Sequence, residues 1–493
     1  MAVSISSVSI VVLLLAFVYK AIIYPAFVSP LAKIPNAHWS APISPAWILW
    51  RRFRMTNNRT IQAAHARLGP IVRLGPSEIS VNCVEGGIKS VYTGGFEKHE
   101  WYPRVFGSLD TVSMFTMIGS KPHSIRKRML SNVYSKSTLQ SSPHLQKISH
   151  AVVVERLLPI IQSAASTEKP IDVHDLNMGL TMDFVSAYLL GLANGTNHLQ
   201  DDEYRKHWLH LYFSRKPYEF YHQEALDAWV LNLCDKAARS LDSTDPSIEP
   251  VVYKQLKHAL DKQSAKEGSK PAPLQQKNDI ACEIYDQLTA GFETSAVGLT
   301  YLFWELSQHP EIQTQLRAEL RTLKPPLTSP GAELPSPKAI DSLPLLEAVV
   351  TETLRLHAPI PGIQPRVTPA PSCTLAGYEN IPPNTRVNAQ AYSLHRNPAV
   401  YPEPEAWRPE RWLKSENSVA ELEERRRWFW AFGSGGRMCV GSNLALQESK
   451  LVVAAIYSNF ETTIVDDTDI EAIDAYTVHP RGQRLVLKFN AVA

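Results

Sequence analysis

Apolar residues recur every three or four positions along most of the chain, which is the period of an amphipathic helix. The segments 61–69 and 144–165 both show this spacing. The longest such segment, 278–310, predicts a helix of about 45 Å that crosses a whole domain and ends at Pro310. A further helix is predicted from near Ser342.

Strand patterns are short and lie towards the two ends of the chain. Residues rich in β-branched side chains and bounded by turn residues occur at 70–81, 373–380, 385–392 and 483–489. Prolines make 323–344 a predicted loop. No repeat or low-complexity tract divides the body, so the pattern predicts one large domain that is mainly α with small peripheral β-sheets.

The first 28 residues differ from the rest because they are almost entirely apolar. Val3 to Val28 carries a single charge, Lys20, and is long enough to cross a bilayer. A cleaved signal peptide is the alternative, but no basic residue precedes the apolar run. Several basic residues follow it, which places the C-terminal side in the cytosol by the positive-inside rule: Lys33, Arg51, Arg52 and Arg54.

These features divide the chain into three parts. Residues 1–28 are the predicted transmembrane anchor, 29–45 a proline-rich linker, and 46–493 the folded domain. We therefore expect a single-pass membrane protein whose folded domain faces the cytosol.

Composition narrows the class of function. Hydrophobic residues make up 44% of the 493-residue chain and the net charge is +2, so bulk electrostatics do not indicate a nucleic-acid partner. The 5 cysteines are odd in number and widely scattered, which argues against a disulfide framework or a structural zinc. Each cysteine must therefore be considered singly.

One cysteine lies in a glycine-rich stretch, "FGSGGRMCVG" at 432–441, which we call the cysteine loop. Cys439 comes just before a predicted helix, whose N-terminus favours a thiolate. Gly435 and Gly441 permit tight turns and the close approach of a planar group. Arg437 suits an anionic cofactor. Haem with a thiolate ligand on its iron meets all three conditions.

The spacing Phe432-x-x-Gly435-x-Arg437-x-Cys439-x-Gly441 resembles the haem-binding signature of the cytochrome P-450 monooxygenases. The resemblance extends over most of the chain. It implies the cytochrome P-450 fold and haem b, with Cys439 as the axial ligand of the iron and Phe432 and Gly435 in the surrounding loop.

Two further segments fit this family. Glu352 and Arg355 stand in "ETLR", and Arg411 stands in "WRPERW" at 407–412. The resemblance implies that these three form a buried structural cluster rather than a catalytic one. Trp412 departs from the family, where phenylalanine is usual, and we expect the exchange to be harmless.

The third segment is "AGFET" at 290–294, in the middle of the long predicted helix. The Thr294 hydroxyl can bond back to the carbonyl of Ala290, and Gly291 lacks a side chain, so the helix is expected to open a groove for dioxygen and water. Glu293 beside Thr294 forms an acid–alcohol pair able to relay protons.

Haem propionates require cations. Arg437 is the first candidate, and Arg366 falls where the family places a propionate-binding arginine. For a third site the family pattern selects His123 and Lys127, although Arg126 or Arg128 is an alternative, and any of these can equally belong to a solvated basic face.

The chain has no dinucleotide-binding motif, so the electrons must come from a partner. The resemblance to the microsomal class implies an NADPH-dependent flavoprotein reductase and the endoplasmic reticulum membrane. The basic runs 126–128 and 425–427 either attract this acidic partner or are solvated surface.

The substrate pocket is expected opposite Cys439 and to be mostly apolar, with a lining drawn from Met114, Phe115, Phe292, 358–364 and Val478. The chain is similar to fungal family members that tailor secondary metabolites, which leaves terpenoid, polyketide and alkaloid substrates open. The expected reaction inserts one oxygen atom from O2 into a lipophilic molecule. The alternatives are a reductase-independent isomerase or dehydratase and a non-catalytic, membrane-anchored haem sensor.

Overall fold

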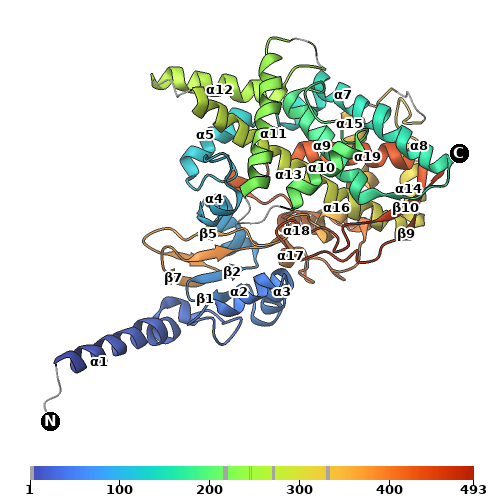
Figure 1. The fold of residues 1–493 in the computed structure, drawn as a ribbon. Helices are drawn as coiled ribbons and strands as arrows, with labels where there is room; N and C mark the ends of the chain where they lie inside the picture. The colour runs from blue at the N-terminus through green and yellow to red at the C-terminus, as the bar shows by residue number, and fades with distance from the viewer. Residues whose placement is uncertain are drawn as a thin grey trace.

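The computed structural model describes residues 5–214, 220–243, 245, 247–268, 273–328 and 333–492. Figure 1 shows a large helical part and a smaller part that contains sheet, with the N-terminal helix projecting from the sheet side. The mainly helical class with small sheets, predicted from hydrophobic periodicity, is confirmed.

Two long helices form the centre of the helical part. α13 (Pro273–Gln308) packs along α9 (Val173–Leu190), whose residues are buried on all sides except at Asp175. A helix that is buried on every face belongs inside a large core. α16 (Pro344–Leu356) and α19 (Ser442–Asn459) complete the same core.

The other α-helices lie outside this centre, and α1 projects away from it (Figure 1). They are α1 Ile5–Val18, α2 Ala46–Phe53, α3 Asn57–Leu68, α4 Trp101–Phe106, α5 Ser120–Leu130, α6 Lys136–Ser141, α7 Pro143–Ser149, α8 Leu158–Ser166, α10 Asp202–Phe213, α11 Phe220–Arg239, α12 Val251–Glu267, α14 Pro310–Leu320, α15 Pro337–Asp341, α17 Ala391–Leu394 and α18 Val419–Trp428. Tighter or wider helical turns are η1 Tyr19–Val28, η2 Pro30–Lys33, η3 Val84–Thr93, η4 His150–Leu157, η5 Pro409–Trp412 and η6 Gly435–Arg437.

The sheet nearest the cysteine loop has the strand order β1-β2-β8-β5-β3 in the described residues. Its strands are β1 Ile71–Gly75, β2 Glu78–Val81, β8 Arg386–Asn388, β5 Arg366–Val367 and β3 Glu97–Lys98. β2 and β8 run parallel, and the other pairs are antiparallel. The β3–β5 register pairs Lys98 with Arg366, so two cationic residues become neighbours.

Two smaller sheets lie elsewhere. β10 (Val486–Ala491) pairs with β4 (Ile171–Asp172) and β9 (Phe460–Asp466), and β6 (Cys373–Leu375) pairs with β7 (Tyr378–Ile381). The predicted strands at 70–81, 373–380 and 483–489 are thus present. In 385–392 only Arg386–Asn388 is a strand, and α17 follows at once.

The predicted loop 323–344 contains one helix that the sequence analysis missed, α15. The Ser336 hydroxyl accepts from the Ala339 N–H at 3.2 Å, and Pro337 occupies the first helical position. Proline is favoured at that position, so here it begins a helix rather than preventing one. Residues 329–332 of this loop lie outside the described residues.

The N-terminal apolar segment lies apart from the core. Ser9–Val28 is long and apolar enough to cross a membrane by length and composition, and it is not buried in the fold. Its end is held to the sheet because the buried Arg73 donates from Nη1 to the carbonyl of Pro25 at 2.7 Å. The proline-rich segment that follows packs against the sheet part through Leu31 and Ile34, so it is not a free spacer.

Candidate active site

A cavity of about 330 Å³ separates the cysteine loop from the middle of α13. It gathers residues that are more than a hundred positions apart in the sequence. Those from α13 and from the cysteine loop include Ala290, Glu293, Thr294, Phe432, Arg437 and Cys439.

The cysteine loop is held in a fixed conformation. The Cys439 N–H donates to the Phe432 carbonyl at 3.0 Å. Gly435 has φ +70°, and a Cβ there would meet the Tyr92 carbonyl oxygen at 2.2 Å. Only glycine fits at this position, because both the conformation and the space exclude a side chain.

Cys439 faces the cavity, immediately before α19. The side chain is open to the cavity. Desolvation by the surrounding protein raises the pKa of its thiol, while the N–H groups of Gly441 and Ser442 and the charge of Lys127 lower it. The thiol sits where it can ligate an iron, and a bound metal would stabilise the thiolate.

Five basic residues line the same cavity: Lys98, His123, Lys127, Arg366 and Arg437. Burial, together with the charges of Arg437 and Lys98, lowers the pKa of His123 to about 3. Burial and the same arginines hold the pKa of Lys98 well below its usual range. Arg366 Nε is buried without a hydrogen-bond partner. Such a cluster is costly until an anion binds, so these residues fit the two carboxylates of haem b.

Lys98 was missed by the sequence analysis. Its Nζ lies 4.1 Å from the centre of the Tyr102 ring and 4.0 Å from that of Phe115. It stands in β3, a strand of two residues, which is too short for any periodic signal, and only the pairing with β5 brings it beside Arg366.

The basic run 126–128 divides among three environments. Lys127 Nζ donates to the carbonyls of Gly436 and Met438, each at 2.9 Å, so it supports the cysteine loop. Arg126 is buried and pairs with Glu283 at 3.3 Å, and Arg128 is exposed. Of the three, Lys127 alone lines the cavity.

The α13 segment contains the expected hydrogen bond: Thr294 Oγ1 donates to the Ala290 carbonyl at 2.6 Å. The helix nevertheless continues through 290–294 without a break. The interpretation of Gly291 was wrong. A Cβ there would meet Val185 of α9 at 2.7 Å, so this glycine permits helix packing rather than opening a groove.

Glu293 is held by two residues that the sequence analysis did not select. The Tyr212 hydroxyl of α10 donates to Glu293 Oε2 at 2.9 Å. His479 Nδ1 lies 3.7 Å from Oε1. Glu293, the acid of the expected acid–alcohol pair, is therefore held in position by α10 and by the segment that contains His479.

The expected pocket lining is partly wrong. Met114 and Phe115 do line the cavity, as do Pro359, Ile360 and Gln364 from 358–364. Phe292 points away and packs against Trp208 and Tyr212 in the core, with ring centres 5.0 and 5.1 Å away. Val478 is buried, and its neighbours Tyr476 and Thr477 line the cavity instead.

The Glu352 cluster lies beneath the cysteine loop and outside the cavity. Arg355 donates to both Glu352 oxygens at 2.8 Å, and Arg411 donates to Oε1 at 3.2 Å. Trp412 Nε1 also donates to Oε2, at 2.9 Å. The unusual tryptophan therefore supplies a hydrogen bond that phenylalanine could not make.

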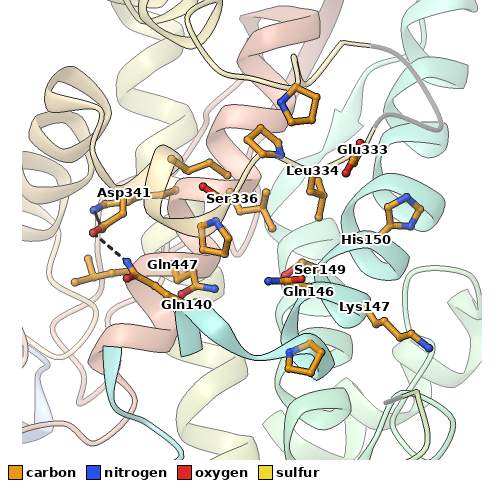
Figure 2. Close-up of a pocket in the computed structure, with 18 of the residues that line it drawn as sticks. Gln140, Gln146, Lys147, Ser149, His150, Glu333, Leu334, Ser336, Asp341 and Gln447 are labelled. Atoms are coloured by element: carbon orange, nitrogen blue, oxygen red, sulfur yellow. Dashed lines mark hydrogen bonds and ion pairs between the residues drawn. The ribbon is translucent and has the colours of Figure 1, made fainter. Parts of the chain in front are cut away.

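A larger cavity of about 700 Å³ lies elsewhere, among α6, α7, α15 and α19 (Figure 2). Gln140 from α6 donates to Asp341 of α15 at 3.4 Å. Asp341 also pairs with Lys136 and Lys450, each at 2.6 Å. Because its described lining includes no cysteine and these lysines are neutralised, this cavity is not the candidate active site.

Comparison with known proteins agrees with this geometry. The family model described as Cytochrome P450 matches residues 42–486. The chain is 30% identical to the cytochrome P450 monooxygenase avaI of Aspergillus versicolor, over 80% of this chain and 96% of that protein. It is 27% identical to the tryprostatin B 6-hydroxylase of Aspergillus fumigatus, over 93% of this chain and 80% of that protein. A cytochrome P450 crystal structure superposes with a TM-score of 0.69 and 22% identity, covering 88% of this chain and 98% of that one.

Proposed function

Because the chain belongs to the cytochrome P450 family and is an oxidoreductase of the monooxygenase class, we propose that it oxidises a lipophilic intermediate of fungal secondary metabolism. One atom of O2 enters the product, and the electrons come from NADPH through a flavoprotein reductase. The names of the relatives support the secondary-metabolite setting.

The observation that carries the proposal is the pairing of two features across one cavity. Cys439 faces Thr294, and the cluster of Arg366, Arg437, His123 and Lys98 surrounds the space between them. When bound through Cys439, haem supplies the reductive activation of dioxygen, which the electron-donating thiolate favours.

The residues of the chain then have separate tasks. Arg366 and Arg437 bind the haem carboxylates, with His123 and Lys98 beside them. Lys127 keeps the cysteine loop in place.

Proton delivery belongs to α13. Thr294 holds a proton at its hydroxyl, whose oxygen lies 2.6 Å from the Ala290 carbonyl oxygen. Glu293, whose Oε2 accepts a hydrogen bond from the Tyr212 hydroxyl, is the acid that supplies protons to Thr294.

The membrane and the reductase complete the proposal. Ser9–Val28 anchors the protein in the endoplasmic reticulum membrane with its folded domain in the cytosol. Of the two basic runs, Arg126 and Arg425 are buried, and Arg427 pairs with Glu85 and Glu424. The exposed Arg128 and Arg426 are the candidates for contact with an acidic reductase.

The test reconstitutes the full-length protein in vesicles with an NADPH–cytochrome P450 reductase and isotopically labelled dioxygen. Terpenoid, polyketide and alkaloid intermediates are supplied, and products are analysed by mass spectrometry. We expect one labelled oxygen atom per product, with no product from Cys439→Ala or without reductase. Unlabelled product formed without NADPH would contradict the proposal and favour an isomerase or dehydratase.

A further inference from the structure

The cavity contains two carboxylates among the residues that line it, Glu293 and Asp286. Glu293 Oε2 already accepts a hydrogen bond from the Tyr212 hydroxyl, as described above. Asp286 lies on the same face of α13, one turn before Ala290 and two turns before Thr294. A carboxylate at this position needs an explanation, because the rest of the substrate side is mostly apolar.

Asp286 is held in place but retains free acceptor capacity. The Ser113 side chain and the Phe115 N–H lie beside the carboxyl and lower its pKa. A carboxylate has about four lone-pair sites, so these two neighbours leave acceptor sites for a ligand in the cavity. Glu283 on the same helix and Lys98 opposite act on Asp286 through space.

Lys98 does not neutralise Asp286 by direct contact. Its Nζ donates to the Phe115 carbonyl and sits over the Tyr102 and Phe115 rings. Among the described residues no ion pair within 4.0 Å joins Lys98 to Asp286. Lys98 therefore acts on Asp286 only through space, and in the part of the chain that the structure describes Asp286 forms no ion pair within 4.0 Å.

Aromatic rings surround this end of the cavity. Phe106 lies 5.3 Å from Phe115 and 4.9 Å from Tyr476, measured between ring centres. Aromatic faces beside a carboxylate form a favourable environment for a cationic group, since the rings attract the charge and the carboxylate accepts its hydrogen bond. Burial raises the pKa of Asp286 to about 7, which a bound cation would reverse.

We propose that Asp286 anchors the substrate by a protonated amine, with the apolar body of the substrate extending along α13 towards Thr294. This inference rests on the proposed function. Eight residues, or about 12 Å of helical rise, separate the anchor from the level of Thr294. The expected substrate therefore has a basic nitrogen about 12 Å from the position that is oxidised. Alkaloids meet this requirement, whereas terpenoid hydrocarbons have no basic nitrogen.

The test measures binding to the haem-loaded, full-length protein by isothermal titration calorimetry at pH 8. Three probes share a twelve-carbon chain and differ in the head group: dimethyldodecylammonium, dodecanol and dodecanoate. We expect the wild type to bind the ammonium about 10- to 100-fold more tightly than the alcohol. Asp286→Asn should abolish this preference, and Asp286→Glu should retain it.

Asp279→Asn is the matched control. Asp279 stands on the same helix and accepts from Thr111 at 2.7 Å, but it does not line the cavity. It should leave the preference unchanged. An unchanged preference in Asp286→Asn would overturn the proposal, as would tightest binding of dodecanoate, which would assign the anchor to Lys98. The carbon monoxide difference spectrum of the same sample is recorded as well. If it is of the thiolate type while the ammonium preference is absent, the amine anchor is wrong but the proposed function is not.

Discussion

Gly435 and Gly436 are adjacent in the cysteine loop but differ in their surroundings. A Cβ at Gly435 would meet the Tyr92 carbonyl oxygen at 2.2 Å, whereas nothing lies within 4 Å of a Cβ at Gly436. We expect Gly435→Ala to lower the haem content of the purified protein severalfold and Gly436→Ala to leave it near the wild-type value. The ratio of haem to protein absorbance measures both. Equal loss in the two variants would contradict the steric argument.

Thr294 offers a second test at the residue scale. Thr294→Ala removes the hydroxyl that bonds Ala290, so we expect product formation to fall by about 100-fold while NADPH oxidation continues and releases peroxide. Thr314 on α14 makes the same bond to Pro310 at 3.0 Å outside the cavity, so Thr314→Ala is the control. Unchanged product per NADPH in Thr294→Ala would remove the hydroxyl from proton delivery.

The sequence predicted the residues whose roles depend on close spacing. Cys439, Arg437 and Gly435 are within five positions of one another, and Thr294 bonds a carbonyl one turn away. It could not predict Lys98 and Tyr212, which reach the cavity only through contacts with segments distant in the chain. The fit of Gly291 against Val185 was invisible for the same reason.

At the scale of elements, the Glu352 cluster joins α16 to η5. Trp412→Phe keeps the packing but removes the hydrogen bond to Glu352, which is fully buried. Hydrogen bonds to buried charges are worth about 1.5–3 kcal/mol, so the free energy of unfolding should fall by about that amount. Urea denaturation measures it, with the exposed Trp50→Phe as control. A decrease in the free energy of unfolding of less than about 0.5 kcal/mol would show that the hydrogen bond from Trp412 to Glu352 does not stabilise the fold.

His395 connects α16 to the start of the cysteine loop. Its Nδ1–H donates to the Arg355 carbonyl at 2.8 Å, and Nε2 accepts the Trp430 N–H at 2.7 Å. Burial and the charge of Arg355 lower the pKa of His395 from 6.5 to about 3. Protonation would therefore break the bond to Trp430.

This pKa makes the stability of the connection depend on pH. Below pH 6.5 the unfolded chain binds a proton at His395 that the folded protein does not, so the histidine destabilises the fold as pH falls. The free energy of unfolding of the wild type should decrease relative to His395→Gln by about 1.4 kcal/mol per pH unit between pH 6 and 4. The comparison cancels the contributions of all other groups. A pH-independent difference would mean that the folded protein protonates His395.

The long helices were predictable because α13 and α16 repeat one pattern over many turns. β3, β4 and β5 have two residues each, so no periodicity marks them, and their existence depends on partners supplied by the tertiary fold. α15 was hidden because proline marks the start of a helix as readily as a loop.

At the scale of the whole molecule, the N-terminal apolar segment and the folded domain meet at the Arg73–Pro25 hydrogen bond. The exposed Trp50 and Phe53 belong to α2, which the Arg52–Glu78 ion pair joins to the same sheet. We expect the full-length protein to remain in the membrane pellet after a high-salt wash and a variant lacking residues 2–28 to be released. Retention of the truncated protein in the membrane pellet would contradict this expectation and would point to the exposed aromatic residues of α2 as the membrane contact. Adding Trp50→Glu and Phe53→Glu to the truncated protein would then test that contact.

The proposed function requires Cys439 to ligate a haem iron in the cavity that Thr294 also lines. The most direct test is the carbon monoxide difference spectrum of the reduced protein, recorded for the wild type, Cys439→His and the control Cys373→Ala. We predict a thiolate-type Soret shift in the wild type and in Cys373→Ala, and its loss in Cys439→His. A thiolate-type spectrum that survives in Cys439→His, or a histidine-type spectrum from folded wild type, would contradict the account.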